Sequence, residues 1–295
     1  MTFEKVTVVG LGLIGGSLAA ALRESGEVGE VFGVERDSDS LSFSLENEII
    51  DSGAREIGPA IWGSDVVIVA TYVNNIAQVC GEVSGFVSSG TVVCDTGSVK
   101  APIVRRMERG LQNIRFVGAH PIAGKETSGV RESWAGLFSG KRCVVTPIES
   151  TCPEALLAVK KLFWLAGSEV VEMDPKSHDE VFSLVSHLPH AVAYSLLGAV
   201  GSGGGERNLF DFSGGGLADF TRIALSSPEM WAGIFIENRE ALLSAIRGFA
   251  GKLGEIEKAV ALGKVEDLEV LLREARDSGI NKEKREENVR ENKEN

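Results

Sequence analysis

His120 is the residue of this sequence best placed for proton chemistry. It follows an apolar run in IRFVGAHPIAG, and Pro121 with the neighbouring glycines predicts a fixed turn at a strand end. A neutral imidazole accepts a proton near pH 7, since the unperturbed pKa of histidine is about 6.5. We therefore expect a catalytic role for His120 rather than one confined to bonding backbone groups.

Ser98, in CDTGSVKAP, is expected in a similar strand-end turn. Its hydroxyl could bond a ligand hydroxyl and His120 together, or it could cap the helix that follows. His187 and His190 share one face of a helix that Pro189 makes irregular. No carboxylate stands at the spacing of a third metal ligand, so we expect no metal site.

Arg222 lies in SGGGLADFTRIA, after glycines that leave backbone N–H groups open to an anion. Its planar guanidinium can bind a carboxylate through two hydrogen bonds. Its apolar neighbours in the sequence are Phe212, Leu217, Phe220 and Ile223. These neighbours favour an inward, ligand-facing arginine, and a surface ion pair is the alternative.

A glycine-rich turn is the first element that must position these side chains. An apolar strand precedes it, a helix of small residues follows it, and the turn itself comprises Gly10, Leu11, Gly12, Leu13, Ile14 and Gly15. Gly10 permits the tight turn, Gly12 allows a pyrophosphate to approach, and Gly15 allows the helix to pack on the strand. The pattern predicts a dinucleotide site at the helix N-terminus.

Glu35 ends the next predicted strand, about 20 residues after the glycines, where an acidic ribose ligand is expected. A carboxylate there repels a 2′-phosphate, which favours NAD over NADP as cofactor. Arg36 could instead pair with a 2′-phosphate. Thr71 and Tyr72 follow a third strand, and we expect them to contact the same cofactor.

Apolar strands alternate with helical stretches as far as Met173, in KVTVVG, EVFGVE, SDVVIVAT, GTVVCD, IRFVGAH, RCVVTP and SEVVEM. This order predicts an α/β fold in which residues 1–173 form a Rossmann-like domain with a parallel sheet. Ligands bind at the carboxyl ends of such strands. Thr71, Asp95 and His120 all stand at those ends.

Residues 174–278 are predicted to form an all-helical dimerisation domain. Ser177 and Glu180 match a capping box, and Ser227 with Pro228 marks a second helix start. From there, apolar residues recur at helical spacing to Ile256, which gives a helix of about 45 Å at ~1.5 Å per residue. Such a length favours a homodimer interface, with packing across the chain's own Rossmann domain as the alternative. The charged segment 279–295 is predicted to be disordered.

The composition is that of an ordinary globular protein, with 43% hydrophobic and 24% charged residues among 295. The net charge of −12 argues against nucleic acid as a partner. No apolar run approaches the ~20 residues of a membrane span, so we expect no membrane contact. Four cysteines without metal spacing indicate reduced thiols in a cytoplasmic protein.

The chain resembles the prephenate/arogenate dehydrogenase family of tyrosine biosynthesis. The resemblance runs from Lys5 to about Val260 and rests on GLGLIGGSLA, DTGSVK, GAHPIAG, SHLPHAVAY and GGGLADFTRIA, with Trp231 following in PEMW. It implies an oxidoreductase that decarboxylates prephenate to 4-hydroxyphenylpyruvate as hydride passes to NAD. It also implies that His120 accepts the hydrogen bond of the ring hydroxyl with help from Ser98.

The same resemblance implies the substrate contacts. His190 would meet the side-chain carboxylate, Arg222 would bind a carboxylate, and Glu126 would gate the pocket. Gly215 and Trp231 complete this implied set. Two positions depart from the commoner family pattern, Tyr72 in place of a proline and Lys125 in place of a small polar residue, and Lys125 bears on selectivity.

Three alternatives remain open at this point. An arogenate dehydrogenase using NAD or NADP is disfavoured because His190 and Lys125 would repel the ammonium group of arogenate. A β-hydroxyacid dehydrogenase would need a catalytic lysine, and none stands between Ser177 and Val200. A nucleotide-sensing regulator without catalysis would have no use for His120, Ser98 and Arg222.

Overall fold

The structure is a computed structural model that describes the chain except Met1, Gln112, Glu126, Glu206 and Asn295. For residues 281–294 it describes the backbone and not the side chains. The chain forms two compact units, Met1–Leu242 and Leu243–Asn295. The predicted domain boundary after residue 173 falls inside the first unit and stays a prediction.

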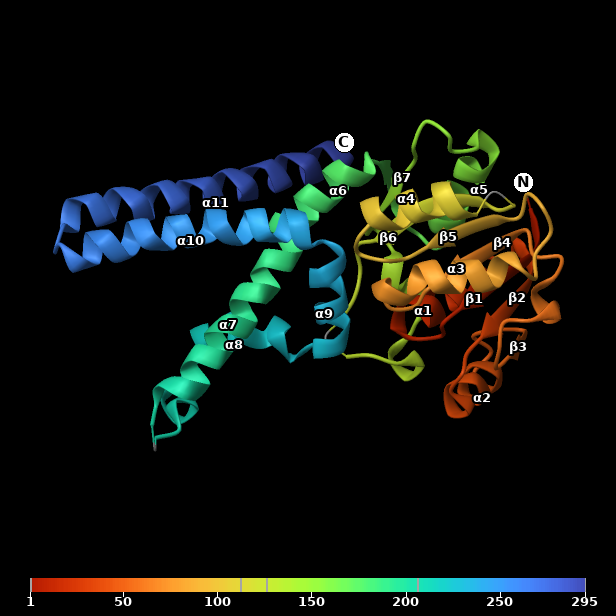
Figure 1. Ribbon diagram of the computed structural model, residues 1–295, viewed down its shortest axis with the longest axis horizontal. Coiled ribbons are helices and arrows are strands. Elements are labelled where there is room, and N and C mark those ends of the chain that lie inside the picture. The colour runs from red at the N-terminus through yellow and green to blue at the C-terminus, as the bar shows by residue number, and fades with distance from the viewer. Residues whose placement is uncertain (1, 112, 126, 206, 295) are drawn as a thin grey trace. The chain divides into compact units, whose positions relative to one another are not determined.

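An eight-stranded sheet forms the centre of the first unit, in the order β3-β2-β1-β4-β5-β6-β7-β8 (Figure 1). The strands are β1 (Phe3–Val9), β2 (Val28–Val34), β3 (Ser52–Ala54), β4 (Val66–Val69), β5 (Val92–Asp95), β6 (Arg115–Pro121), β7 (Arg142–Thr146) and β8 (Glu169–Glu172). The predicted Rossmann-like sheet is confirmed, and only the three-residue β3 was not foreseen.

One strand pair corrects the expectation of a wholly parallel sheet, because β7 runs antiparallel to β6. A parallel neighbour usually needs a helical crossover. The connection from β6 to β7 instead contains two short 3-10 turns, η3 (Val130–Glu132) and η4 (Ala135–Phe138). They pack against α1 (Leu13–Glu24). Just before η4, the backbone N–H of Trp134 donates to Ser17 Oγ of α1 at 3.0 Å.

Two apolar cores lie on opposite faces of the sheet. Along β4, Val66 and Ile68 belong to one core while Val67 and Val69 belong to the other, as a strand buried on both faces requires. The first core includes side chains of α1 and of α5 (Pro153–Leu165). The second includes side chains of α3 (Ile76–Ser84), α4 (Ala101–Gly110) and α9 (Pro228–Glu237). The remaining helix near the sheet is α2 (Ser38–Glu46).

The helical segment begins where predicted, but its capping residue differs from the prediction. Asp174, not Ser177, caps α6 (Pro175–Phe182), and its side chain accepts the Ser177 N–H at 2.9 Å. The irregularity predicted at Pro189 takes the form of a π-helical turn, η5 (Ser183–His187), before α7 (Leu188–Gly203). After α7 come the short elements η6 (Leu209–Phe212), α8 (Gly215–Thr221) and η7 (Arg222–Leu225).

The helix expected from Pro228 to Ile256 is in fact two helices, which corrects the prediction. Its start is right, because Ser227 caps α9 and accepts the Met230 N–H at 3.2 Å. The chain then breaks at Asn238, and α10 (Arg239–Ala261) follows. Periodicity did not reveal this break, because the apolar spacing continues through it.

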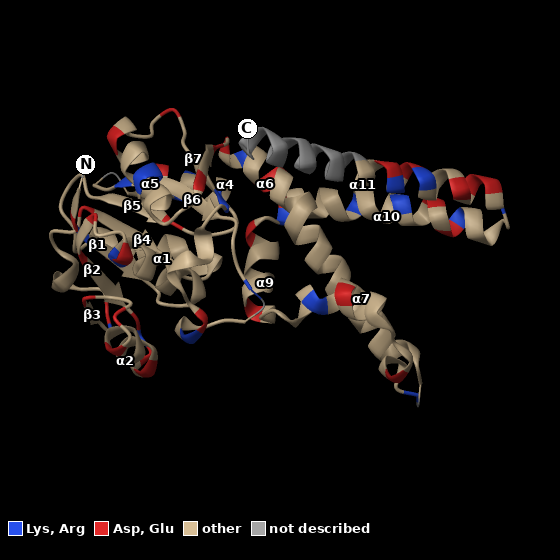
Figure 2. Cartoon of the chain, turned by 180° about the vertical axis from the view of Figure 1, so that it is seen from behind, with Lys and Arg blue, Asp and Glu red and all other residues tan. Residues whose placement is uncertain are grey.

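The second unit contains most of α10 and all of α11 (Val265–Glu294). Basic and acidic residues are interspersed along the part of this unit that is coloured by residue type (Figure 2). The backbone of residues 279–294 is helical, although the composition predicts disorder there. Glu, Lys and Arg dominate this segment, and they are strong helix formers. The side chains of residues 281–295 lie outside those described.

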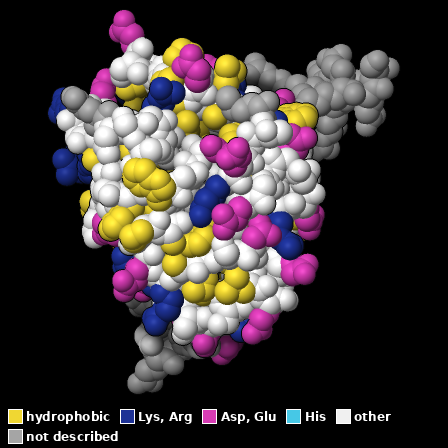
Figure 3. Space-filling view, turned by 90° about the vertical axis from the view of Figure 1, so that its right-hand side faces the viewer, with side chains coloured by type: hydrophobic (Ala, Val, Ile, Leu, Met, Phe, Trp, Pro, Cys, Tyr) yellow, Lys and Arg dark blue, Asp and Glu magenta, His cyan; other side chains and the backbone are white. Residues whose placement is uncertain are grey.

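The surface carries no single basic face on the side shown in Figure 3, where both signs of charge are interspersed. One helical stretch, Pro175–Gly203, is long and apolar enough to span a membrane by length and composition, contrary to the expectation from the sequence. This stretch carries Asp179 and His187, whose polar contacts lie inside the first unit.

Candidate active site

The glycine turn has the geometry of a dinucleotide site. Gly10 has a φ of +94°, and a Cβ there would lie 2.7 Å from the Ala70 carbonyl oxygen. A Cβ on Gly15 would lie 1.9 Å from the Gly10 carbonyl oxygen, so α1 requires glycine to pack this closely. Gly12 faces open space, and no side chain caps α1. The open helix N-terminus therefore suits a pyrophosphate.

Glu35 holds this turn against β2. Its carboxylate accepts the Leu11 N–H at 2.9 Å and the Asp37 N–H at 3.0 Å, which keeps it at the strand end where a ribose would lie. The Arg36 carbonyl accepts from the guanidinium of Arg55 at 3.1 and 3.2 Å.

Thr71 and Tyr72 follow β4 at the same edge of the sheet. Among the described residues, the buried Thr71 hydroxyl has no hydrogen-bond partner. Tyr72 is exposed and precedes the turn η2 (Val73–Asn75). The Tyr72 side chain is therefore open to a ligand, whereas the Thr71 hydroxyl is covered.

A buried ion pair joins the ends of β5 and β6. Asp95 and Lys100 are fully buried and bonded to each other. Asp95 also accepts the N–H groups of Gly97 at 3.0 Å and Ala119 at 3.2 Å, while Lys100 Nζ donates to the Ala119 carbonyl at 2.7 Å. Because Ala119 precedes His120, this pair fixes the backbone that carries the histidine.

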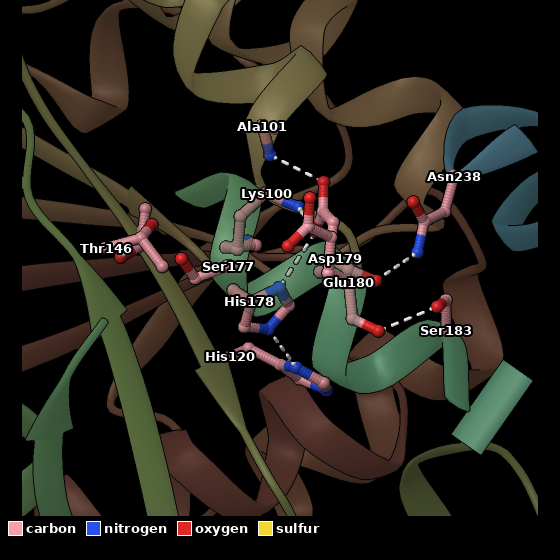
Figure 4. A network of polar contacts seen from close by, with 12 residues as sticks. Lys100, Ala101, His120, Thr146, Ser177, His178, Asp179, Glu180, Ser183 and Asn238 are labelled. Carbon is pink, nitrogen blue, oxygen red and sulfur yellow. Dashed lines mark hydrogen bonds and ion pairs between the residues drawn. The ribbon is translucent and has the colours of Figure 1, made fainter. Parts of the chain in front are cut away.

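A chain of hydrogen bonds leads from His120 to a carboxylate (Figure 4). His120 Nδ1 lies 2.8 Å from His178 Nε2, and His178 Nδ1 lies 2.8 Å from Asp179 Oδ1. Asp179 also accepts the backbone N–H groups of Lys100 and Ala101, each at 2.8 Å. The carboxylate thus caps α4 from a helix almost 80 positions along the chain.

This row of hydrogen bonds determines which ring nitrogen of His120 carries the proton. An ionised carboxylate only accepts, so His178 Nδ1 carries the proton that it donates to Asp179. The lone pair on His178 Nε2 then accepts from Nδ1–H of His120. His120 Nε2 is left with its lone pair, which is the form that a hydrogen-bond acceptor requires.

Burial keeps both histidines neutral. It lowers the pKa of His120 well below 6.5, and the nearby His178, Lys100 and His187 act in the same direction. Burial also lowers the pKa of His178, although its hydrogen bond to Asp179 opposes this shift. The ordinary pKa expected for His120 from the sequence is therefore corrected downwards.

His190 and Trp231 form a second group of ring side chains in the candidate site. The two rings are stacked with centroids 3.5 Å apart, and His190 Nδ1 lies 2.9 Å from the Ser186 carbonyl oxygen. Burial lowers the pKa of His190. Trp231 Nε1 and the Nε2 of His187 are buried without a hydrogen-bond partner among the described residues.

Other predicted residues lie differently. Ser98 makes no hydrogen bond to His120 within the described residues, and it does not cap α4, because Asp179 does. Arg222 begins η7 and is exposed, which differs from the inward side chain expected. Gly215 begins α8. Glu126 lies outside the described residues.

Sequence reasoning missed His178, Asp179, Lys100 and Asn238 as members of the site. Lys100 had a local signal, since it stands two residues after Ser98 in DTGSVK. His178 and Asp179 fell within a segment whose local pattern indicated only a helix start. Their distance in sequence from His120 conceals the contact.

Two family models divide the chain between them. The nucleotide-binding domain of prephenate dehydrogenase matches residues 18–172, and the dimerization domain of prephenate dehydrogenase matches residues 174–274. The chain belongs to the prephenate dehydrogenase family. The resemblance drawn from the motifs is confirmed, as is the fold of a Rossmann-like domain followed by a helical one.

Relatives that are named for different substrates, prephenate and arogenate, resemble this chain. The prephenate dehydrogenase of Bacillus subtilis is 32% identical over 276 residues, which are 92% of this chain and 73% of that protein. The crystal structure of the Aquifex aeolicus prephenate dehydrogenase with hydroxyphenyl propionate and NAD+ has a TM-score of 0.90 and 37% identity, over 95% of this chain and 99% of that one. The arogenate dehydrogenase of Synechocystis has a TM-score of 0.79 and 25% identity, over 94% and 99%.

Membership in the prephenate dehydrogenase family makes the chain a dehydrogenase of tyrosine biosynthesis. The nucleotide-binding domain supports a nicotinamide dinucleotide cofactor, and the open glycine turn at α1 fits one. The helical domain is of the kind that forms dimers in this family.

Proposed function

We propose that this protein is a cytoplasmic, homodimeric, NAD-dependent prephenate dehydrogenase. It converts prephenate to 4-hydroxyphenylpyruvate and carbon dioxide. The observation that carries the proposal is the Asp179–His178–His120 chain, which leaves an acceptor nitrogen at the end of β6. The glycine turn lies at the same edge of the sheet.

The chemistry needs little beyond this acceptor. When bound, NAD supplies the acceptor for a hydride. His120 Nε2 accepts the hydrogen bond of the ring hydroxyl and draws its proton partly away, so electron density rises at the carbon that loses hydride. The ring carboxylate leaves as carbon dioxide, the ring becomes aromatic, and the proton returns to the phenol. No net proton is released.

Two carboxylates of prephenate need partners. We assign one to Arg222 and the other to His190, with Ser98 beside the hydroxyl and with Gly215, Trp231 and Glu126 around the substrate. Arg222 and the neighbouring Phe212 and Phe220 are exposed in one chain. A second subunit of the homodimer would cover this surface.

The choice of substrate rests on charge near its side chain. Burial lowers the pKa of His190, whose Nδ1–H is directed to the Ser186 carbonyl, so without substrate its Nε2 carries no proton near pH 7. A substrate carboxylate beside Nε2 favours the protonated ring, and only that form donates to the carboxylate and repels the ammonium group of arogenate. Lys125, whose ammonium lies 4.2 Å from the centre of the Trp134 ring, is the remaining cation that favours prephenate.

The choice of cofactor rests on Glu35 at the end of β2, where its carboxylate would face the ribose hydroxyls and repel a 2′-phosphate. Replacing Glu35 by Ser should weaken NAD and improve NADP. If the wild type already prefers NADP and Arg36→Ala removes that preference, the assignment to NAD is wrong.

A matrix of prephenate and arogenate against NAD and NADP tests the proposal. We expect the highest kcat/KM with prephenate and NAD. A higher kcat/KM with arogenate would make the protein an arogenate dehydrogenase, as in the Synechocystis relative. Turnover of neither substrate would contradict the proposal.

A further inference from the structure

Asn238 lies at the break between α9 and α10, and it is buried. Its Nδ2 lies 2.9 Å from the Asp179 carbonyl oxygen and 3.0 Å from His187 Nδ1. Figure 4 shows the Asn238 amide directed at the backbone beside Asp179. The helix break therefore places one amide against two elements of the site, α6 and the π-helical turn η5.

These contacts determine the orientation of the Asn238 amide. A backbone carbonyl oxygen only accepts hydrogen bonds, so the Asn238 atom facing the Asp179 carbonyl must be the donor Nδ2. The same NH2 group has a second hydrogen, and it is directed to His187 Nδ1. That nitrogen must then be the acceptor. A neutral His187 consequently carries its proton on Nε2.

The other side of the His187 ring does not oppose this tautomer. His187 is fully buried and its Nε2 makes no hydrogen bond to the described residues. The tautomer is therefore set from the Nδ1 side of the ring, by Asn238.

The groups around His187 keep it neutral at physiological pH. Burial lowers its pKa to about 4, and the nearby His178 and His190 also lower it. Asp179 and the Ser98 backbone raise it without reversing the shift. The ring of Trp231 stands edge-on to it with centroids 6.2 Å apart and carries no charge.

We propose that Asn238 is a positioning residue: it holds His187 with its proton on Nε2 and ties the turn η5 to the backbone of Asp179, whose carboxylate bonds His178. The effect on turnover rests on the proposed function, because it supposes that His120 is the catalytic acceptor. The tautomer itself rests only on the contacts of Asn238.

Nuclear magnetic resonance of the ring nitrogens tests the tautomer directly. The chain has four histidines, so 15N-histidine labelling gives few signals, and single His→Gln variants assign them. In the full-length protein without cofactor or substrate at pH 7.5, we expect His187 Nε2 to be protonated and Nδ1 not. A proton on Nδ1, or on both nitrogens, would overturn the proposal whether or not the protein turns over prephenate.

Asn238→Asp then tests the cause. A carboxylate cannot donate, so His187 should move its proton to Nδ1 or become charged, and kcat with prephenate should fall about 10- to 100-fold as the Asp179 carbonyl loses its donor. Asn47→Asp is the matched control, because Asn47 also ends a helix, α2, and donates to a carbonyl, but is exposed. It should leave the His187 signals and kcat unchanged.

The outcomes separate the two claims. Unchanged His187 signals in Asn238→Asp would overturn the role of Asn238 in setting the tautomer. A changed tautomer with normal kcat would overturn the positioning role. If Asn238→Asp does not fold, His187→Gln, whose amide oxygen can still accept from Asn238, should retain more activity than His187→Leu, and equal losses would contradict the role of the Asn238–His187 contact.

Discussion

At the scale of single residues, the proposed mechanism depends on the position of one proton on His120. Asp179 can only accept, and this constraint passes through His178 to leave a lone pair on His120 Nε2. The same carboxylate caps α4 through Lys100 and Ala101. One side chain therefore supports both the proton arrangement and the local fold.

Replacing Asp179 by Asn should lower kcat by about 10²–10⁴-fold, because the neutral amide no longer fixes the tautomers of His178 and His120. Asp174→Asn is the matched control, since the Asp174 side chain also caps a helix and bonds neither histidine ring. Steady-state kinetics on both variants measure the difference. Similar losses in the two would show that capping alone matters.

The pH profile should report the lowered pKa of His120. The neutral ring is the active form, so kcat/KM is lost as the pH falls through the pKa of the folded protein. Because burial places that pKa well below 6.5, the acid limb should lie below pH 6.5. An acid limb at or above pH 6.5 that disappears in His120→Asn would contradict this shift.

At the scale of elements, the carboxyl ends of β5 and β6 are joined by the buried Asp95–Lys100 pair. Removing one partner of a buried pair leaves an uncompensated charge, which costs more than the pair itself contributes. This pair therefore ties the strand end that carries His120 to the turn that carries Ser98.

Lys100→Met should lower the free energy of unfolding by about 3–5 kcal/mol, because Asp95 is left buried without its cation. Lys176→Met removes an exposed lysine paired with Glu180 and should cost under about 1 kcal/mol. Urea denaturation compares the two. A cost below about 1 kcal/mol for Lys100→Met would show that the pair does not hold these strands.

The sequence predicted elements whose signals are local. The glycine turn, the buried strands and the Ser227 cap all depend on neighbours a few positions apart. The capping of α4 by Asp179, the break at Asn238 and the antiparallel β7 depend on contacts between distant segments, so no local pattern reveals them. Arg222 shows a related limit. Apolar neighbours in the sequence predict that a side chain is covered, but they do not show whether the covering residues belong to the same subunit or to a second one.

At the scale of the whole molecule, apolar side chains stay exposed in the part that matches the dimerization domain. On α10 these include Leu243, Ile246, Phe249, Leu253 and Val260. Contiguous exposed apolar surface usually marks an interface. We therefore expect a homodimer in solution.

Light scattering at micromolar concentration should give twice the mass of one chain, which is 31.4 kDa. Leu253→Glu should shift the protein towards monomer, because it places a charge in the interface. Leu157→Glu is the control, since Leu157 is exposed on α5 in the nucleotide-binding domain. A wild-type monomer would mean that α10 does not form the interface.

The most direct test of the central claim is the steady-state rate of His120→Asn with prephenate and NAD. The account predicts that kcat falls by about 10²–10⁴-fold while the KM for prephenate changes little, because His120 acts most strongly as the hydroxyl loses its proton. A near-normal kcat for His120→Asn, with the acid limb of the wild type retained, would contradict it.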